Sequence, residues 1–382
     1  MSWRYPLSTL AVPEEDVQAV VACLEEGWLT MGPRTQAFEA ALASELGAEH
    51  VACVSSGTSA LHLSCIAAGL GPGDEVIVPS MASVATASAI RCCGADPVLC
   101  DVLSPTSPTL DSNDVAQRIT PRTKAVIASH FCGYGADVDA LGALCEERGL
   151  LLIEDATQAI EATVGATGAK AGTVGAIGCL SFSSSSPESQ LCVGEGGAVL
   201  TADADMDARV RSLRSHAMTS GTWDRHRGYS QTYDVIDVGF NFRLDEPRAA
   251  LGLSRLPRLA GEIEERRRVV GAYRERLGGL AGVELPWSEE DVDRASHFAF
   301  ALLAESRERR DGVRAALAEG GVQTTWHLAI HRFTDYADAH PEGSLPRTEE
   351  TAARHLCLPL SPSMDEDDLQ AVCAALERAL ES

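Results

Sequence analysis

The stretch S-F-S-S-S-S-P-E-S-Q-L-C-V-G-E-G-G, residues Ser181–Gly197, lies between two short apolar segments. Gly178–Phe182 on one side and Gly197–Thr201 on the other have the length and composition of strands. The stretch itself is rich in serine and glycine and contains no lysine. The two lysines of the chain, Lys124 and Lys170, both precede it. We therefore predict a polar loop flanked by two strands.

Upstream of this loop, short apolar strands alternate with helices. The first strand, Val51–Ser55, leads through the turn S-S-G-T (Ser55–Thr58) into a helix, and the last, Leu150–Glu154, ends at Asp155. Between them the pattern predicts strands at Glu75–Val78, Pro97–Asp101 and Ala125–Ser129, and helices at Ser59–Ala68, Val84–Cys92, Asp114–Ile119 and Val138–Arg148. Such alternation is typical of an α/β fold with a mostly parallel sheet, whose ligands bind at the carboxyl ends of the strands. The turn S-S-G-T is a candidate anion site, because small residues there expose N–H groups at the positive end of a helix.

Both ends of the chain add further elements. An amphipathic helix is predicted at Pro13–Leu29. The polar stretch Ser215–Asp237 is a long irregular excursion, which usually serves function or subunit contact. A long helical stretch at Asp245–Leu277 is predicted to lead to a smaller C-terminal α/β domain, with a strand at Phe298–Leu303 and helices near Arg307–Glu319 and Asp367–Leu380. We expect a large α/β domain at residues 1–245 and a small one at 246–382.

The composition is that of an ordinary folded protein. A chain of 382 residues is long enough for two domains, and contents of 45% hydrophobic and 23% charged residues are typical of globular proteins. No apolar run approaches the ~20 residues that span a bilayer, and the N-terminus lacks a signal-peptide core, so a cytoplasmic location is expected. The formal net charge of -24 argues against nucleic acid or an anionic membrane as a partner, since both are polyanions.

Cysteine and histidine give no clear metal pattern. The 12 cysteines contain no C-x-x-C pair and are interpreted as small buried residues. Cys53 and Cys192 are possible nucleophiles, but a place in the core is the simpler interpretation. His327 and His331 are four residues apart and could share a helix face, yet no third ligand lies nearby in sequence. No metal site is predicted.

Eight short motifs cover nearly the whole chain. In order they are G-W-L-T-x-G-P at Gly27–Pro33, S-S-G-T-x-A-L at Ser55–Leu61, G-D-E-V-I-V-P-S at Gly73–Ser80, T-P-R-T-K-A-V at Thr120–Val126, I-E-D-A-x-Q-A at Ile153–Ala159, G-E-G-G at Gly194–Gly197, G-F-N-F-R at Gly239–Arg243 and H-x-x-x-H at His327–His331. With them the chain resembles the DegT/StrS-type sugar aminotransferases, a family of fold-type-I enzymes that use pyridoxal phosphate (PLP). The resemblance implies a large domain whose mostly parallel sheet is sandwiched by helices, a smaller C-terminal domain, and a homodimer.

The resemblance also assigns cofactor contacts. Asp155 would pair with the protonated pyridine nitrogen and keep the ring an electron sink, and Gln158 would bond the ring hydroxyl. Gly57, Thr58 and Ser181 would bind the cofactor phosphate. Without a cofactor, Asp155 would simply cap the following helix, and Gly57 and Thr58 would form an ordinary helix N-terminus.

Other contacts would involve the substrate or the second subunit. The resemblance implies that Asn241 reaches the cofactor phosphate bound in the other subunit. Thr30, Arg225 and Arg227 are candidates for substrate contact, and the two arginines could hold an anionic substrate against the overall negative charge. A solvated loop is the alternative for Arg225 and Arg227.

The site departs from the family at three positions. The lysine that forms the Schiff base should fall at Ser186 when counted forward from Ser181, but at Ser189 when counted back from Gly194. Neither is lysine, and the disagreement indicates a small insertion. Ser83 stands where an aromatic residue usually stacks on the pyridine ring. Thr157 replaces an alanine of the family motif, so three independent changes fall on one site.

These departures leave three functions open. The one favoured by the sequence is a repurposed enzyme of specialised, antibiotic-type metabolism, acting on an amino sugar, cyclitol or nucleotide sugar without covalent PLP. The second is an enzyme resembling the dehydratases and aminotransferases that use pyridoxamine phosphate (PMP), with PLP or PMP bound non-covalently. The third is a catalytically silent scaffold for a genuine aminotransferase. Candidate catalytic residues are Asp155, Gln158, Ser186, Ser189, His327 and His331.

Overall fold

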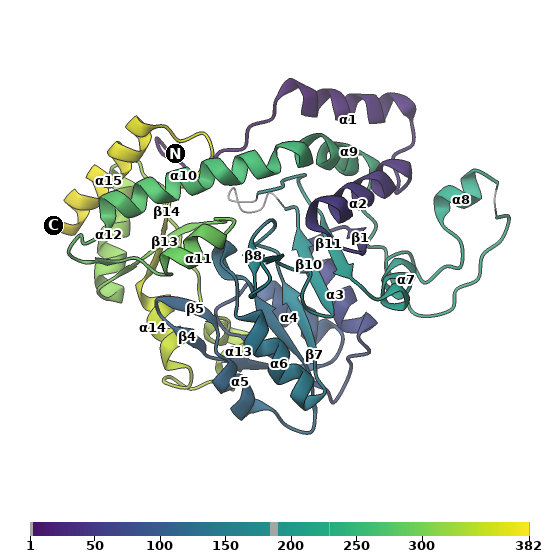
Figure 1. Cartoon of the computed structure of the whole chain (residues 1–382), viewed down its shortest axis with the longest axis horizontal. Helices are drawn as coiled ribbons and strands as arrows, with labels where there is room; N and C mark the ends of the chain where they lie inside the picture. The colour runs from purple at the N-terminus through teal and green to yellow at the C-terminus, as the bar shows by residue number, and fades with distance from the viewer. Residues whose placement is uncertain (1–2, 184–189, 229, 382) are drawn as a thin grey trace.

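The centre of the structure is a seven-stranded sheet (Figure 1). The computed structural model describes residues 3–183, 190–228 and 230–381. In the order β1-β11-β10-β7-β6-β2-β3, strand β11 runs antiparallel to both neighbours and the other pairs are parallel. The strands are β1 (His50–Val54), β2 (Glu75–Pro79), β3 (Asp96–Cys100), β6 (Thr123–Ser129), β7 (Leu151–Asp155), β10 (Ile177–Ser181) and β11 (Gly197–Thr201). The predicted α/β fold with a mostly parallel sheet is confirmed.

Both faces of this sheet are buried, which explains why its strands are continuous apolar runs. In β2, Val76 and Val78 join one hydrophobic cluster and Ile77 joins another, because side chains alternate along a strand. The helices that bury the first face are α3 (Gly57–Ala67), α4 (Val84–Cys92) and α7 (Ala204–Leu213). Those that bury the second are α2 (Pro33–Leu46), α5 (Ser112–Arg118) and α6 (Val138–Arg148).

The N-terminal helices are held by one buried carboxylate, that of Glu246. Its oxygens accept hydrogen bonds from the backbone N–H groups of Gly32 (2.8 Å), Arg34 (2.8 Å) and Thr35 (2.9 Å) at the start of α2. These first N–H groups have no partner within the helix, so Glu246 caps α2 from a distant part of the chain. Glu246 also begins α9 (Glu246–Arg255), against which α1 (Glu14–Glu26) packs.

The helical stretch predicted at Asp245–Leu277 is interrupted. Helix α9 ends at Arg255, and a 3-10 turn at Leu256–Arg258 separates it from α10 (Leu259–Leu277). Pro257 lies in this turn and has no N–H to donate, which breaks the helical hydrogen-bond ladder. Helix α10 then runs towards the C-terminal elements (Figure 1).

The C-terminal region contains a smaller sheet of three antiparallel strands. Their order is β12 (Val283–Glu284), β13 (Phe300–Ala304) and β14 (His355–Leu358). The two predicted helices are present as α12 (Arg307–Glu319) and α15 (Glu366–Glu381). The hydrophobic cluster around this sheet also includes Phe131 and Cys132 from the loop after β6. The two sheets are therefore joined by packed side chains.

The other elements are short. They are β4 (Val102–Ser104), β5 (Ser107–Leu110), β8 (Thr163–Val164), β9 (Ala169–Lys170), α8 (Thr222–His226), α11 (Glu289–Arg294), α13 (Thr334–Ala337), α14 (Pro346–Arg354) and the 3-10 turns η1 (Phe131–Gly133) and η3 (Ile330–Arg332). The polar stretch Ser215–Asp237 was correctly predicted to be mostly irregular, and α8 is the one helix among its described residues. Among the described residues, no helix has the length and apolar character needed to cross a membrane.

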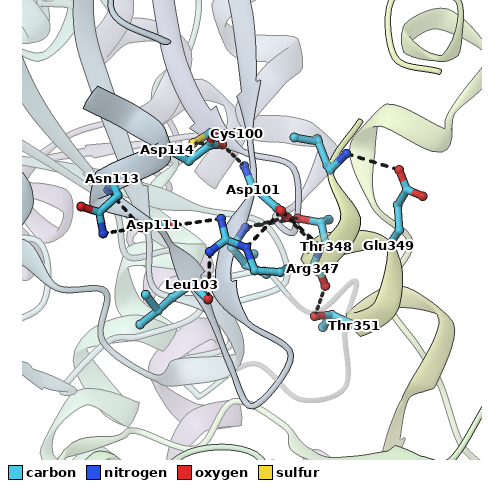
Figure 2. Close-up of polar contacts among 12 residues, drawn as sticks. Cys100, Asp101, Leu103, Asp111, Asn113, Asp114, Arg347, Thr348, Glu349 and Thr351 are labelled. Carbon is cyan, nitrogen blue, oxygen red and sulfur yellow. Dashed lines mark hydrogen bonds and ion pairs between the residues drawn. The ribbon is translucent and has the colours of Figure 1, made fainter. Parts of the chain in front are cut away.

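A polar network joins the end of β3 to α14 (Figure 2). Asp101 accepts hydrogen bonds from the backbone N–H (2.7 Å) and hydroxyl (2.6 Å) of Thr348, and from Nε of Arg347 (3.2 Å). The same guanidinium lies 2.7 Å from Asp111. Burial alone would raise the pKa of Asp101, but the donors from Thr348 and Arg347 lower it overall. The carboxylate is therefore kept ionised as a link between the two regions.

Candidate active site

A cavity of about 300 Å³ opens beside the central sheet. Its lining comes from the turns that follow β1, β2 and β7, from the end of β10, and from the residues on either side of the serine-rich loop. These turns lie at the carboxyl ends of strands that run parallel, where α/β folds bind ligands. The described lining residues are Ser56, Gly57, Thr58, Leu61, Ser83, Ala85, Thr157, Ser181, Ser183 and Glu195.

One wall of the cavity is the N-terminus of α3. The Ser56 hydroxyl accepts a hydrogen bond from the N–H of Ser59 (3.0 Å) and so caps the helix. A Cβ at Gly57 would stand 2.7 Å from Cβ of Ser181 and 3.2 Å from Cγ2 of Thr157, so only glycine permits this close approach. The exposed Thr58 adds a hydroxyl beside the first N–H groups of the helix. This arrangement suits a phosphate.

Asp155, at the end of β7, is not among the described residues that line the cavity, but it contacts Thr157, which is. Its carboxylate is 2% exposed and accepts hydrogen bonds from the hydroxyls of Thr86 and Thr157, both at 2.6 Å. The backbone N–H of Thr157 adds a third donor at 3.2 Å. These donors fix the orientation of the carboxylate. Thr86 was missed by the sequence analysis, although its place in the first turn of α4, after Ser83, was a signal that it faces the same strand ends.

Gln158 and Ser83 were both predicted to lie near the cofactor ring, but only Ser83 lines the cavity. Gln158 does not line the cavity; its amide oxygen accepts a hydrogen bond from the N–H of Cys132 at 2.9 Å. Ser83 does line the cavity, and its hydroxyl caps α4 by accepting from the N–H of Ala85 at 3.3 Å. None of the described residues that line the cavity is aromatic, as expected from serine at position 83.

The structure separates the two predicted histidines from the cavity. His331 is fully buried, with Nδ1 2.6 Å from the Ser80 hydroxyl and Nε2 3.5 Å from Glu349. Burial, with a smaller effect of Arg332, lowers the pKa of His331 to about 4. His327 is partly buried, with its ring 5.0 Å from that of Phe131. Neither residue lines the cavity, so any influence on it is indirect.

The predicted substrate and second-subunit residues lie outside the cavity lining of this chain. Arg225 is on α8, donates to the carbonyl of Ser220 (2.6 Å) and stacks 4.6 Å from the ring of Tyr233. Arg227 follows the helix and is exposed. Asn241 is exposed next to its bridge partner Ser215. Thr30 is in the connection between α1 and α2.

The serine-rich loop is described only at its two ends. Ser181 and Ser183 before it, and Glu195 after it, line the cavity. Ser186 and Ser189, the two candidates for the lysine position, lie outside the described residues. Glu195 was not predicted as a site residue, although its place in G-E-G-G beside the loop was a signal.

The comparisons with known proteins agree with this geometry. The model of the DegT/DnrJ/EryC1/StrS aminotransferase family matches residues 11–377. The chain belongs to this family. The resemblance deduced from its motifs is thus confirmed, as is the fold.

Several proteins that resemble this chain are known sugar aminotransferases or bind the same kind of cofactor. The chain is 36% identical over 374 residues to dTDP-4-dehydro-2,3,6-trideoxy-D-glucose 4-aminotransferase of Saccharopolyspora spinosa, covering 96% of this chain and 94% of that protein. It is similar to the crystal structure of S. venezuelae DesV, with a TM-score of 0.90, 34% identity and complete coverage of both chains. It is also similar to NtdA of Bacillus subtilis with bound cofactor PMP, with a TM-score of 0.84, 27% identity, and 97% and 82% of the two chains covered.

PLP or PMP is the cofactor of this family. The cavity suits the phosphate of this cofactor better than the carbon that forms its Schiff base. The cavity borders the N-terminus of α3 at Gly57 and Thr58, where N–H groups and hydroxyls suit a phosphate. The Schiff base, however, has no lysine. Lys124 is exposed on β6, and Lys170 on β9 pairs with Glu161. Neither lysine is among the described residues that line the cavity.

Proposed function

We propose that this member of the DegT/DnrJ/EryC1/StrS family is a sugar-modifying enzyme that holds PMP, or PLP, without a covalent bond. One observation carries the proposal. The cavity combines a phosphate cradle, in which Gly57 packs against Ser181, with a chain whose two lysines both lie elsewhere. The sequence alone favoured a reaction without cofactor over one with non-covalent PMP or PLP. The phosphate cradle and the PMP-bound relative support non-covalent PMP or PLP as the first candidate instead.

The residues of this chain would divide the work of holding the cofactor. The N–H groups at the start of α3 and the hydroxyls of Thr58 and Ser181 would bind the phosphate. Asp155, oriented by Thr86 and Thr157, would present its carboxylate to the ring nitrogen. When bound, the cofactor supplies an electron sink for breaking a bond at the substrate carbon. The proton that the family's lysine moves must then be moved by another group.

Binding without the lysine should be reversible. Serine at position 83 provides no aromatic stack, whose absence costs about 0.5–1.5 kcal/mol beyond the loss of buried area. The phosphate contacts remain the main source of affinity. We therefore expect the cofactor to bind but to leave the protein on dialysis.

The substrate class follows from the relatives and from the exposed arginines. The relative from S. spinosa carries the name of an enzyme acting on a dTDP-linked sugar. We propose a sugar-like, nucleotide-linked or amino-sugar substrate of specialised metabolism, handled by a cytoplasmic enzyme. Arg225 and Arg227 would meet its anionic part, and Thr30 its sugar.

A homodimer is part of the same proposal. Asn241, Arg225 and Arg227 do not line the cavity of their own chain, so they would act in the cavity of a second copy. Val235, Ile236 and Val238, just before Asn241, are 53%, 67% and 79% exposed. A second copy would cover this apolar stretch.

The test is a titration of the purified protein with PMP and PLP, followed by calorimetry. We expect saturable one-to-one binding that disappears on dialysis, with no adduct after borohydride reduction of the PLP complex. Ser181→Ala should weaken binding about tenfold, because it removes one phosphate donor. Ser254→Ala, which removes a hydroxyl bonded to Asp16 outside the cavity lining, is the control. A borohydride adduct on Lys124 or Lys170 would contradict non-covalent binding.

A reaction without cofactor is the second candidate. The observation that favours it is the lack of an aromatic side chain among the described residues of the cavity. If neither PMP nor PLP binds while the protein still converts a sugar substrate, the reaction without cofactor becomes the first candidate. The third candidate, a silent scaffold, is less favoured. Three donors orient the carboxylate of Asp155, and a scaffold would have no need of this.

A further inference from the structure

Four side chains with metal-binding chemistry meet between the loop after β6 and the C-terminal sheet. Cys132 is in that loop, His327 follows α12, and His355 and Cys357 are on β14. The ligand atoms of Cys132, His327 and His355 lie within 4.8 Å of one another. Sγ of Cys357 is 3.9 Å from Nδ1 of His327 and 4.0 Å from Nε2 of His355. The thiol of Cys357 also contacts that of Cys132.

The backbone explains why these residues meet. His355 and Cys357 are two apart on a strand and so share one face of it. The N–H of Cys357 donates to the carbonyl of Thr325 (2.7 Å), and the N–H of Thr325 donates back to Cys357 (3.3 Å). This pairing places His327, two residues after Thr325, beside β14. Cys132 reaches the same point from the other side, in a turn held by Gln158.

The cluster is buried and electrically unusual for a hydrophobic core. Cys132, His355 and Cys357 are each 0% exposed. Nδ1 of His355 is buried and has no hydrogen-bond partner. Nε2, the other nitrogen of this ring, is the one that faces Cys357 and would bind an ion. Without a bound ion, two buried thiols and two imidazoles would cost more free energy than aliphatic side chains that fill the same space.

The geometry and the ligand types match zinc. Zinc is bound tetrahedrally at about 2.3 Å from sulfur and about 2.0–2.1 Å from nitrogen, which places neighbouring ligand atoms roughly 3.3–3.8 Å apart. The separations of 3.9 and 4.0 Å need only a small contraction to reach this range. Two cysteines and two histidines are one of the usual closed, structural sets of zinc ligands.

We propose that Cys132, His327, His355 and Cys357 form a structural zinc site that fastens the C-terminal sheet to the loop after β6. No third ligand stands near His327 and His331 in the sequence. His331 is instead engaged with Ser80 and Glu349. The zinc ligands come from three separate segments, so local spacing does not reveal them. The site is independent of the proposed cofactor, because none of its four residues lines the cavity.

Zinc content of the whole purified protein is the first measurement. We expect about one zinc per chain by elemental mass spectrometry after gel filtration, and at least a tenfold lower content in Cys132→Ser and in His327→Ala. Cys92→Ser, at an exposed position, is the matched control and should keep its zinc. Because His327 is partly exposed, His327→Ala should fold even where changes to buried ligands do not.

Cobalt provides a second measurement that does not depend on any variant. Co²⁺ added to the zinc-free wild type should give the absorbance of tetrahedral cobalt bound to thiolates, and zinc should displace it. Two results would overturn the proposal: a wild type that neither contains nor takes up one zinc per chain, or unchanged zinc in His327→Ala. Each is obtained without PMP, PLP or any activity, so it leaves the proposed function untouched.

Discussion

The hydroxyl of Thr86 lies 2.6 Å from Oδ2 of Asp155, and both residues are buried. Thr86 is in the first turn of α4, after β2, while Asp155 ends β7, two strands away in the sheet. The contact therefore ties the orientation of the carboxylate to the helix that follows Ser83. Since Asp155 is the residue expected to face the cofactor ring, Thr86 becomes a positioning residue for it.

Thr86→Val should weaken cofactor binding. Valine keeps the shape of threonine but removes the donor, and a hydrogen bond to a charged group contributes about 1.5–3 kcal/mol. We expect the dissociation constant for PMP to rise roughly 10- to 100-fold. Calorimetric titration measures this effect. Thr86→Ser keeps the hydroxyl and should bind nearly as well as the wild type, whereas equal binding by the valine variant would remove Thr86 from the site.

Gly57→Ala should close the phosphate cradle. The added Cβ would stand 2.7 Å from Cβ of Ser181, so the turn or β10 must move. We expect a loss of stability of about 1–3 kcal/mol, measured by denaturant unfolding, and loss of measurable PMP binding. Gly312→Ala in α12 is the control, since a Cβ there meets nothing within 4 Å. It should be neutral or slightly stabilising. Normal PMP binding by Gly57→Ala would place the phosphate elsewhere.

The fold was predictable because its signals are local. The strands of the central sheet are buried on both faces, so they appear in the sequence as apolar runs, and several of them lead into a helix. The contact between Gly57 and Ser181 could be expected only through the family motifs. Thr86 was missed because its partner, Asp155, is distant in sequence and no motif pairs them. Short β14, with the sequence H-L-C-L, gave no signal that separates a strand from a turn.

The zinc ligands show the limit of sequence analysis most clearly. Cys132, His327 and the β14 pair are brought together by the packing of two sheets, which periodicity does not encode. His327 and His331 share a motif, yet the structure sends them to different partners. Spacing in a sequence is informative only when both residues belong to the same element.

The free energy of unfolding should decrease as the pH is lowered, because of His331. Its pKa is lowered to about 4 from an ordinary 6.5, mainly by burial. Between these values the unfolded chain binds a proton on the ring that the folded chain does not, so stability is lost as pH drops through this window. The full loss is on the order of 3 kcal/mol. Denaturant unfolding at pH 7 and pH 5 should show a smaller change in His331→Gln than in the wild type.

The control for that experiment is His226→Gln, at an exposed position on α8. Its change in stability between pH 7 and pH 5 should match that of the wild type. A pH dependence that is identical in His331→Gln and the wild type would show that His331 is not kept neutral by the fold.

Restoring a lysine should decide which serine occupies the family's lysine position. Ser186→Lys and Ser189→Lys correspond to the two counts, forward from Ser181 and backward from Gly194. Because a lysine within reach of the cofactor carbonyl forms a Schiff base, one of the two variants should turn yellow with PLP and give a borohydride adduct at the new residue. Ser363→Lys, at an exposed position in the C-terminal region, is the control and should stay colourless. If neither variant reacts although both bind PMP normally, the loop does not approach the cofactor, and the loss of lysine at this site reflects a rebuilt cavity and not a simple replacement.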